Sequence, residues 1–519
     1  MNWKKRVLSA MAVVGLLSGA MGEESNSLAV VRPYVLTPKP GPSPRINGAR
    51  VYGSRPGTPF SFKVPATGIG PKRYLAKGLP DGLSIDEQTG VISGVTPPPG
   101  AYRVRLTVSN RVGRDEKELL IKSGERICLT PPMGWNSWNC WAYSVSADKV
   151  RASARAMVEK GLIDHGWTYV NVDDTWQGER GGRFSSIQGN EKFPDMKGLC
   201  EEIHRMGLKV GIYSTPWVRS YANRTGGSAD FPDGSIRNPD AKKMGKNWRL
   251  GEFSFATNDA LQWAEWGIDY LKYDWRPIDT AHVIEMANAL RKTNRTVVYS
   301  LSNTAPFEKA EIFARHANCW RTTTDIRDTW ESLETIGFLQ DRWAPFAAPG
   351  HWNDPDMLVL GEVGGWKSEL HPSRLTPDEQ YLHVSLWCLL SAPLLIGCPI
   401  ESMDEFTLSL LTNDEVLEVN QDPLGRSARR IVVDEANHTE IWLKEMADGS
   451  RAVGLFNRSA SPRSITFEFS AARLAGGTWK VRDLWRQEDL GDHAKRFCAR
   501  KVPAHGVVLL RMRHLADAP

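Results

Sequence analysis

Acidic and basic side chains lie close together at the end of one apolar stretch of the chain. The segment YLKYD, residues 270–274, ends on Asp274 and carries Lys272 two positions earlier. Residues two apart on a β-strand share a face, so the ammonium and the carboxylate are expected to point the same way. A nearby cation favours the ionised form of a carboxylate. We therefore interpret Asp274 as a carboxylate kept charged for chemistry, with a purely structural ion pair as the alternative.

Similar polar residues follow other predicted strands. They are Trp135 and Asn136 in MGWN, Asp173 and Asp174 in YVNVDD, Tyr213 in KVGIY, Arg321 and Asp325 in CWRTTTD, and Asp354 and Asp356 in HWNDPDM. A single aspartate after a strand commonly caps the next helix, but these acids are expected to converge on one mouth. Clustered carboxylates also suit Mg²⁺ or Ca²⁺. Because Lys272 and Arg321 already supply positive charge, and neither H-x-H nor H-E-x-x-H occurs, we predict no metal site.

Carboxylates that act without a metal or a histidine indicate glycoside hydrolysis. That reaction needs one ionised and one protonated carboxyl group. Asp274 is the candidate for the ionised group. Asp325 and Asp328 are both candidates for the protonated one, and their spacing in the sequence does not choose between them.

A (β/α)8 barrel would bring these strand ends together. Residues 127–420 alternate strand-like runs such as YVNVDD and KVGIYST with helical runs such as MKGLCEEIHRMG, which indicates βα units and a parallel sheet. The length and the count of about eight strands fit a TIM barrel with insertions, whose active site lies at the carboxyl ends of the strands. A dinucleotide-binding sheet is disfavoured, because no G-x-G-x-x-G follows the first strand.

The predicted fold is multidomain, with a β-sandwich on each side of the barrel. Residues 45–123 contain short alternating strands such as AYRVRLTVSN, and residues 425–515 return to the same pattern, which predicts an antiparallel β-sandwich. The stretch beginning GLPDGLSIDEQTG resembles the immunoglobulin (Ig)-like modules of bacterial secreted enzymes. Residues 23–44 are rich in Pro and Gly and are predicted to form a linker.

The first 22 residues have the pattern of a signal peptide. Lys4, Lys5 and Arg6 precede the apolar run VLSAMAVVGLLSGA, and small residues follow up to Gly22. This predicts a secreted or periplasmic protein with no membrane attachment after cleavage. The formal net charge is only +5, with both signs spread along the chain, so no nucleic-acid partner is expected.

Seven motifs together resemble the α-galactosidase (melibiase) family, glycoside hydrolase family 27. They are LTPPMGWNSWNCW, YVNVDDTW, KVGIY, YLKYD, WRTTTDIRDTW, HWNDPDML and VNQDPLG, and they occur in the family's order between about residues 127 and 515. The resemblance implies a retaining exo-glycosidase that acts on α-galactoside glycans and needs no cofactor. It implies Asp274 as the nucleophile, Asp325 rather than Asp328 as the acid/base, and hydroxyl-binding roles for Asp173 and Asp174. Further implied sugar contacts are Trp135 by stacking, together with Tyr213, Lys272, Arg321 and Asp356.

The chain departs from the family pattern after the fifth predicted strand. Animal α-galactosidases carry Glu and Leu there against the sugar C2, whereas α-N-acetylgalactosaminidases carry Ser and Ala, which leave room for an acetamido group. This chain reads YSLSNTAPF and places Ser302 and Ala305 at those positions. Cleavage of α-galactosides is the first expectation and of α-N-acetylgalactosaminides the second. A β-L-arabinopyranosidase and a non-catalytic sugar-binding barrel are further alternatives.

Overall fold

An Ig-like β-sandwich opens the part of the chain that the structure describes. The computed structural model describes residues 34–238, 245–366, 369–474 and 476–517, so the predicted signal peptide lies outside it. One sheet has the order β2 (Val51–Ser54), β9 (Arg114–Ser123), β8 (Gly100–Ser109), β5 (Arg73–Lys77), and the other β3 (Pro59–Lys63), β7 (Val91–Val95), β6 (Leu83–Ile85). The alternating apolar residues of both sheets, among them Phe62, Ile92, Val104 and Leu119, form one buried core. Short strands β1 (Arg45–Ile46) and β4 (Ala66–Thr67) pair beside them.

Eight parallel strands form the central sheet, in chain order around it. They are β10 (Met133–Asn136), β11 (Tyr169–Val172), β14 (Lys209–Ser214), β17 (Tyr270–Asp274), β18 (Val298–Ser302), β19 (Cys319–Arg321), β20 (Trp352–Asp354) and β23 (Leu394–Ile396), with β10 paired to β23. A parallel bridge from Leu358, just after β20, to Ile396 in β23 joins the two ends of this curled sheet. All six residues of β14 are buried, as expected for a strand covered on both faces.

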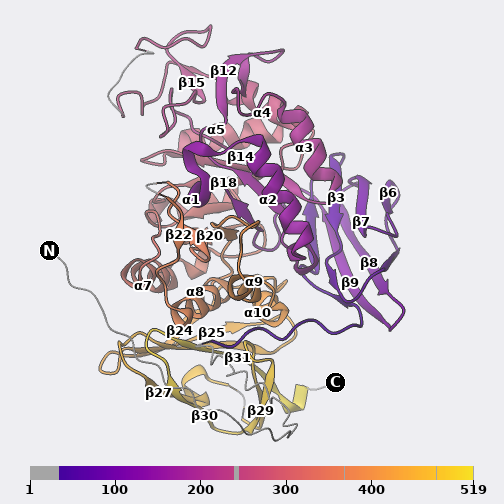
Figure 1. The fold of residues 1–519 in the computed structure, drawn as a ribbon, viewed down its shortest axis with the longest axis vertical. Helices are drawn as coiled ribbons and strands as arrows, with labels where there is room; N and C mark the ends of the chain where they lie inside the picture. Colours follow the sequence, from indigo (N-terminus) through magenta and orange to yellow (C-terminus); the bar gives the residue numbers. More distant parts are fainter. Residues whose placement is uncertain (1–33, 239–244, 367–368, 475, 518–519) are drawn as a thin grey trace, which may run out of the picture. The chain divides into compact units, whose positions relative to one another are not determined.

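Helices between the strands cover the outside of the sheet (Figure 1). They include α2 (Ala147–Glu159), α3 (Met196–Arg205), α4 (Ala256–Trp266), α5 (Thr280–Arg291), α6 (Ala310–His316), α7 (Trp330–Phe338) and α8 (Pro377–Leu389). Several begin at a residue whose side chain accepts a hydrogen bond from the first turn: Asp195 for α3, Asp279 for α5 and Thr329 for α7. Thr376 and Glu379 form a capping box at the start of α8.

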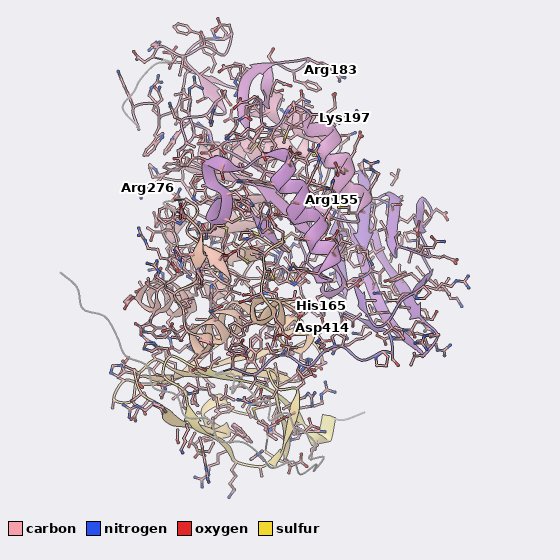
Figure 2. The ribbon with its side chains drawn as sticks, in the orientation of Figure 1. Arg155, His165, Arg183, Lys197, Arg276 and Asp414 are labelled. Carbon is pink, nitrogen blue, oxygen red and sulfur yellow. The ribbon has the colours of Figure 1, made fainter. Side chains whose placement is uncertain are left out.

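The barrel also carries short additional elements. Two small antiparallel strand pairs, β12 (Gln177–Gly181) with β13 (Ser186–Gly189) and β15 (Ser228–Ala229) with β16 (Phe253–Ser254), follow strands β11 and β14. Helices α9 (Glu405–Leu411) and α10 (Asp414–Asn420) follow the last barrel strand. The Nδ1 atom of His165 lies 2.7 Å from Asp414 Oδ1, so a buried polar pair ties the segment before β11 to α10 (Figure 2).

A C-terminal antiparallel sandwich completes the chain. Its larger sheet has the order β24 (Arg429–Asp434), β25 (Thr439–Glu445), β26 (Arg451–Asn457), β31 (Val507–His514), β28 (Trp479–Asp483), β29 (Glu488–His493), and β27 (Arg463–Glu468) pairs with β30 (Arg496–Val502). Phe467 and Phe497 of the smaller sheet share a core with Val453, Val481 and Leu510 of the larger one. The predicted fold class, a TIM barrel between two β-sandwiches, is therefore confirmed. No helix within the described ranges is long and apolar enough to cross a membrane.

Candidate active site

One cavity opens at the carboxyl ends of the barrel strands and has a volume of about 200 Å³. Of the predicted site residues, it is lined by Asp173, Asp174, Tyr213, Lys272, Asp274, Ser302, Arg321, Asp325 and Asp356. These residues come from six different strands or from the positions that follow them. The parallel register is the cause, because it places equivalent strand ends at one edge of the sheet. Trp138, Asn139, Tyr221, Asn303, Ile326, Met357 and Trp366 complete the lining and were not predicted.

Lys272 donates a hydrogen bond to Asp173 in the structure, while its charge also acts on Asp274. Its Nζ lies 2.8 Å from Asp173 Oδ2, which also accepts a hydrogen bond from Asn136 Nδ2 at 2.8 Å. Side chains two apart on a strand are separated by about 6.5–7 Å along it, whereas Asp173, at the end of β11, reaches the ammonium across the barrel interior. Burial opposes the charge on Lys272, but the Asp173 and Asp274 carboxylates outweigh it and raise the lysine pKa.

Burial dominates the electrostatics of Asp274. It raises the pKa of this carboxyl group to about 7, and the charges of Asp173 and Asp325 act in the same direction. Lys272 and a hydrogen bond from Asn303 favour the ionised form, but they do not outweigh burial. Lys272 therefore acts on Asp274 in the predicted direction, but burial outweighs it and the net shift of the Asp274 pKa is upward.

Asn303 is the contact of Asp274 that sequence reasoning missed. Its Nδ2 donates to Asp274 Oδ1 and also to the Tyr221 hydroxyl at 3.2 Å. The residue directly follows β18 and has a φ of 69°, in the left-handed region that asparagine adopts more readily than most residues. An asparagine after a predicted strand is therefore a signal that could have identified it.

The structure distinguishes Asp325 from Asp328, the two candidates for the protonated carboxyl group between which sequence spacing could not choose. Asp325 lines the cavity with a side chain that is 76% exposed, and Arg321 Nη2 lies 3.2 Å from its Oδ1. Asp328 is buried outside this cavity and is held by the Arg374 guanidinium at 2.6 and 3.0 Å. Desolvation at the cavity mouth opposes ionisation of Asp325, but the charges of Arg321 and Lys272 outweigh it and lower its pKa.

Arg321 joins Asp325 to a second buried acid. The same Nη2 lies 2.8 Å from Asp356 Oδ2, which also accepts a hydrogen bond from the backbone N–H of Ile326. Burial raises the pKa of Asp356 to about 6, and Arg321 opposes that rise. Asp356 has a φ of 96°, so a tight turn aims its carboxylate into the cavity.

Two predicted sugar contacts lie outside the cavity lining. Trp135 is 0% exposed, with its Nε1 bonded to the Cys398 carbonyl, because its side chain belongs to the packed barrel interior. Trp138, three residues later, lines the cavity instead. Ala305 is buried and its backbone N–H donates to the Arg321 carbonyl, so the turn after β18 presents Ser302 and Asn303 to the cavity instead.

Tyr213 and Asp174 present polar atoms suited to a hydroxyl-rich ligand. The Tyr213 hydroxyl is buried, and no protein group in the described ranges bonds to it. Burial raises the pKa of Asp174 to about 6, although the backbone N–H of Ala222 donates to its Oδ2 at 3.0 Å.

No group of three or more His, Cys, Asp or Glu side chains among the described residues is arranged to hold a metal ion.

Comparison with known proteins places this site in a family. The family model described as Alpha galactosidase A matches residues 130–248 and 244–422. The chain belongs to the α-galactosidase (melibiase) family. It is a glycoside hydrolase. A model of the family's C-terminal β-sandwich matches residues 436–512, and a model of an Ig domain matches residues 43–121.

Relatives of this α-galactosidase family member cover most of its length. Alpha-galactosidase A of Cellvibrio japonicus is 33% identical over 418 residues, which cover 75% of this chain and 93% of that protein. A Bacteroides fragilis structure provisionally named an α-galactosidase/melibiase is 32% identical, with a TM-score of 0.80, and covers 91% of this chain and 98% of its own. A β-L-arabinopyranosidase from Geobacillus stearothermophilus is 28% identical, with a TM-score of 0.64 over 75% of this chain and 98% of its own.

Proposed function

We infer that the protein hydrolyses terminal α-D-galactosyl residues of oligosaccharides or polysaccharides with retention of configuration at the anomeric carbon. The observation that carries this inference is the pairing of Asp274 and Asp325 in one cavity with the hydroxyl-binding candidates Asp173 and Asp174. Retaining glycosidases need a nucleophilic carboxylate and a second carboxyl group that transfers the proton. The cavity supplies both, and family membership supports the same reaction.

The reaction proceeds in two displacements. In the first, the Asp274 carboxylate attacks C1 of the galactosyl unit while Asp325 protonates the departing glycosidic oxygen, so the C1–O bond breaks and a glycosyl ester forms. In the second, Asp325 takes a proton from water, which attacks C1 and releases Asp274. Two inversions give net retention.

The proton has to move between the two carboxyl groups before the first displacement. In the free protein the pKa of Asp274 is raised to about 7 and that of Asp325 is lowered, so the pair holds its single proton on Asp274. A bound glycoside covers the exposed Asp325 side chain and removes water from it, which raises its pKa. Positive charge developing at C1 favours ionised Asp274. Substrate binding thus shifts the proton to the group that needs it.

Asp173 and Asp174 select the galacto configuration. Both carboxylates line the cavity and accept hydrogen bonds, which suits the axial 4-hydroxyl and the 6-hydroxyl of galactose. A glucoside has an equatorial 4-hydroxyl and an arabinopyranoside lacks the 6-carbon, so each would lose one hydrogen bond to these acids. Charge-assisted hydrogen bonds of this kind contribute about 1.5–3 kcal/mol, roughly ten- to a hundredfold in kcat/KM.

The decisive experiment combines variants with a substrate panel. Asp274→Ala and Asp325→Ala are expected to lose activity on nitrophenyl α-galactoside by several orders of magnitude, and azide should rescue the first as a glycosyl azide. Asp328→Asn is the matched control and should retain activity, because Asp328 lies outside the cavity. Wild-type preference for α-glucosides or β-L-arabinopyranosides would overturn the substrate assignment, and active Asp274→Ala would overturn the mechanism.

A second activity, on α-N-acetylgalactosaminides, has one specific observation in its favour. Ser302, a small side chain, lines the cavity and leaves space at the position predicted to face C2. Ser302→Glu should suppress this activity more than α-galactoside cleavage. An unchanged ratio of the two rates would show that Ser302 does not contact the substituent at C2 of the sugar.

We also propose that the protein is secreted or periplasmic. The basic, apolar and small-residue segments of residues 1–22 support export. N-terminal sequencing of the mature protein should begin at Glu23, and an intact Met1 on the cell-associated protein would contradict export.

A further inference from the structure

A second cavity lies at the amino ends of the barrel strands, away from the catalytic carboxylates. Its lining includes Val297, Asn318 and His351, which immediately precede strands β18, β19 and β20, together with residues 125–127 that lead from the Ig-like sandwich to the barrel. Its volume is about 360 Å³, within the roughly 300–1,000 Å³ typical of small-molecule sites. The proposed reaction uses none of these residues, so the function of this cavity is a separate question.

The cavity is basic. Arg126, Arg291 and Arg315 line it, and Glu125 is the only carboxylate among its described lining residues. Arg291 donates to an amide oxygen and to a backbone carbonyl, neither of which neutralises its charge. Arg315 lies 3.7 Å from Glu311, but both side chains are more than 70% exposed, and such pairs contribute little.

The positive charge of the cavity affects the pKa of two histidines in its lining. Burial lowers the pKa of His316, and Arg291 and Arg315 lower it further. Burial likewise lowers the pKa of His351, and Arg126 adds to the effect. Both rings are therefore neutral at neutral pH, and the arginines remain available to an anion.

A buried polar atom without a protein partner belongs to the lining. His316 Nδ1 is buried, and no protein group in the described part of the chain bonds to it. Burying a donor or acceptor without a partner destabilises a fold, so a water or a ligand atom is expected beside it. Ala287, Leu290 and Ala314 form an apolar part of the same lining. The occupant that fits has an oxyanion and a compact carbon body.

We propose that this cavity binds a small saccharide that carries a phosphate or sulfate group. The oxyanion lies against Arg126, Arg291 and Arg315, because guanidinium groups bind tetrahedral oxyanions through paired N–H donors. The sugar ring lies against Ala287, Leu290 and Ala314, and one of its hydroxyls bonds to His316. The site is distinct from the galactoside cavity in both its residues and the charge of its ligand.

Isothermal titration of the full-length protein with glucose 6-phosphate and glucose 6-sulfate tests this proposal. Saturating galactose is present throughout to occupy the catalytic cavity, and glucose is the uncharged reference. The wild-type protein should bind at least one charged sugar and not glucose, and the tighter of the two identifies the oxyanion. The double variant Arg126→Gln/Arg315→Gln should bind that sugar at least about tenfold more weakly.

Matched controls separate this site from a general charge effect. Arg103→Gln removes one exposed arginine of the Ig-like sandwich, which pairs with Glu118, and should bind as the wild type does. Tm and hydrolysis of nitrophenyl α-galactoside should be unchanged in both proteins, because none of these arginines is buried in the barrel core. Absence of binding, or equal affinity of the wild type and the double variant, overturns the site. Inorganic phosphate that binds as tightly as glucose 6-phosphate overturns the saccharide assignment.

Discussion

At the scale of single residues, the catalytic pair is governed by unequal solvent exposure. Asp274 is buried among other acids, whereas Asp325 lies at the cavity mouth beside Arg321. Residue types and strand spacing predicted Asp274 but left Asp325 and Asp328 as alternatives, and only the resemblance to the family implied Asp325. The same pattern could not predict which oxygen Lys272 would contact, since Asp173 comes from a strand about 100 residues earlier in the chain.

The two pKa shifts predict a bell-shaped dependence of kcat/KM on pH. This quantity reports the free enzyme, and the pair is active only when it holds one proton. Above pH about 7 that proton is lost and kcat/KM falls, because the pKa of Asp274 is raised to about 7. The acid limb lies below the ordinary aspartate value of about 3.9, because the pKa of Asp325 is lowered. Initial rates on nitrophenyl α-galactoside between pH 3 and 9 measure both limbs, and an alkaline limb near pH 5 would contradict the assignment.

Asn303 is predicted to tune this profile. Its hydrogen bond favours ionised Asp274, so Asn303→Ala should raise the pKa of Asp274 further and move the alkaline limb to higher pH. Loss of a charge-assisted hydrogen bond of about 1.5–3 kcal/mol should lower kcat/KM roughly ten- to a hundredfold. Asn303→Gln, which keeps the amide, is the comparison. A uniform loss of activity with an unmoved alkaline limb would limit Asn303 to a structural role.

At the scale of elements, the insertion between β14 and α4 forms part of the cavity wall. Trp217 and Trp248 lie nearly parallel with ring centroids 6.2 Å apart, and Tyr221 packs edge-on against Trp248 at 4.8 Å. Tyr221 lines the cavity, and the neighbouring Ala222 N–H bonds to Asp174. In the sequence, residues 218–252 are mostly polar and interrupt the alternation of strand-like and helical runs. Its contribution to the site depends on aromatic contacts between residues some 30 positions apart, which no local pattern predicts.

Removing the support of this wall should weaken substrate binding more than chemistry. Trp248→Ala takes away the ring against which Tyr221 packs, but leaves Asp274 and Asp325 in place. We expect KM for nitrophenyl α-galactoside to rise several-fold while kcat changes less. Trp248→Phe keeps an aromatic ring and should lie near the wild type. A fall in kcat with unchanged KM would show that the insertion acts on the reacting groups instead.

At the scale of the whole molecule, the N-terminal sandwich contacts the barrel far from the catalytic carboxylates. Lys72 Nζ lies 2.9 Å from Asp164, and Arg55 donates to the Leu290 and Arg295 carbonyls at the end of α5. Thr296 bonds to Ser54 and Thr58 of the sandwich. The alternating pattern of residues 45–123 predicted the sandwich itself. These docking contacts could not be predicted, because they depend on polar residues in turns that have no periodicity.

Truncation to residues 127–519 is predicted to separate stability from catalysis. No residue of the sandwich lines the catalytic cavity, so kcat and KM on nitrophenyl α-galactoside should stay close to those of the full-length protein. The polar contacts of Arg55 and Lys72 are lost, and the buried Lys209, whose ammonium lies 5.5 Å from the Tyr52 ring, becomes exposed.

A lower Tm, by several degrees, should follow from these losses, because each lost hydrogen bond to a charged group removes on the order of 1 kcal/mol or more. Thermal unfolding at fixed protein concentration measures the shift, and Arg55→Ala in the full-length chain should reproduce part of it.

Truncation also removes Arg55, Glu125 and Arg126 from the basic cavity, so binding of glucose 6-phosphate should disappear while galactoside hydrolysis remains. Loss of hydrolysis at temperatures where the truncated protein is still folded would show that the sandwich shapes the catalytic cavity through the barrel.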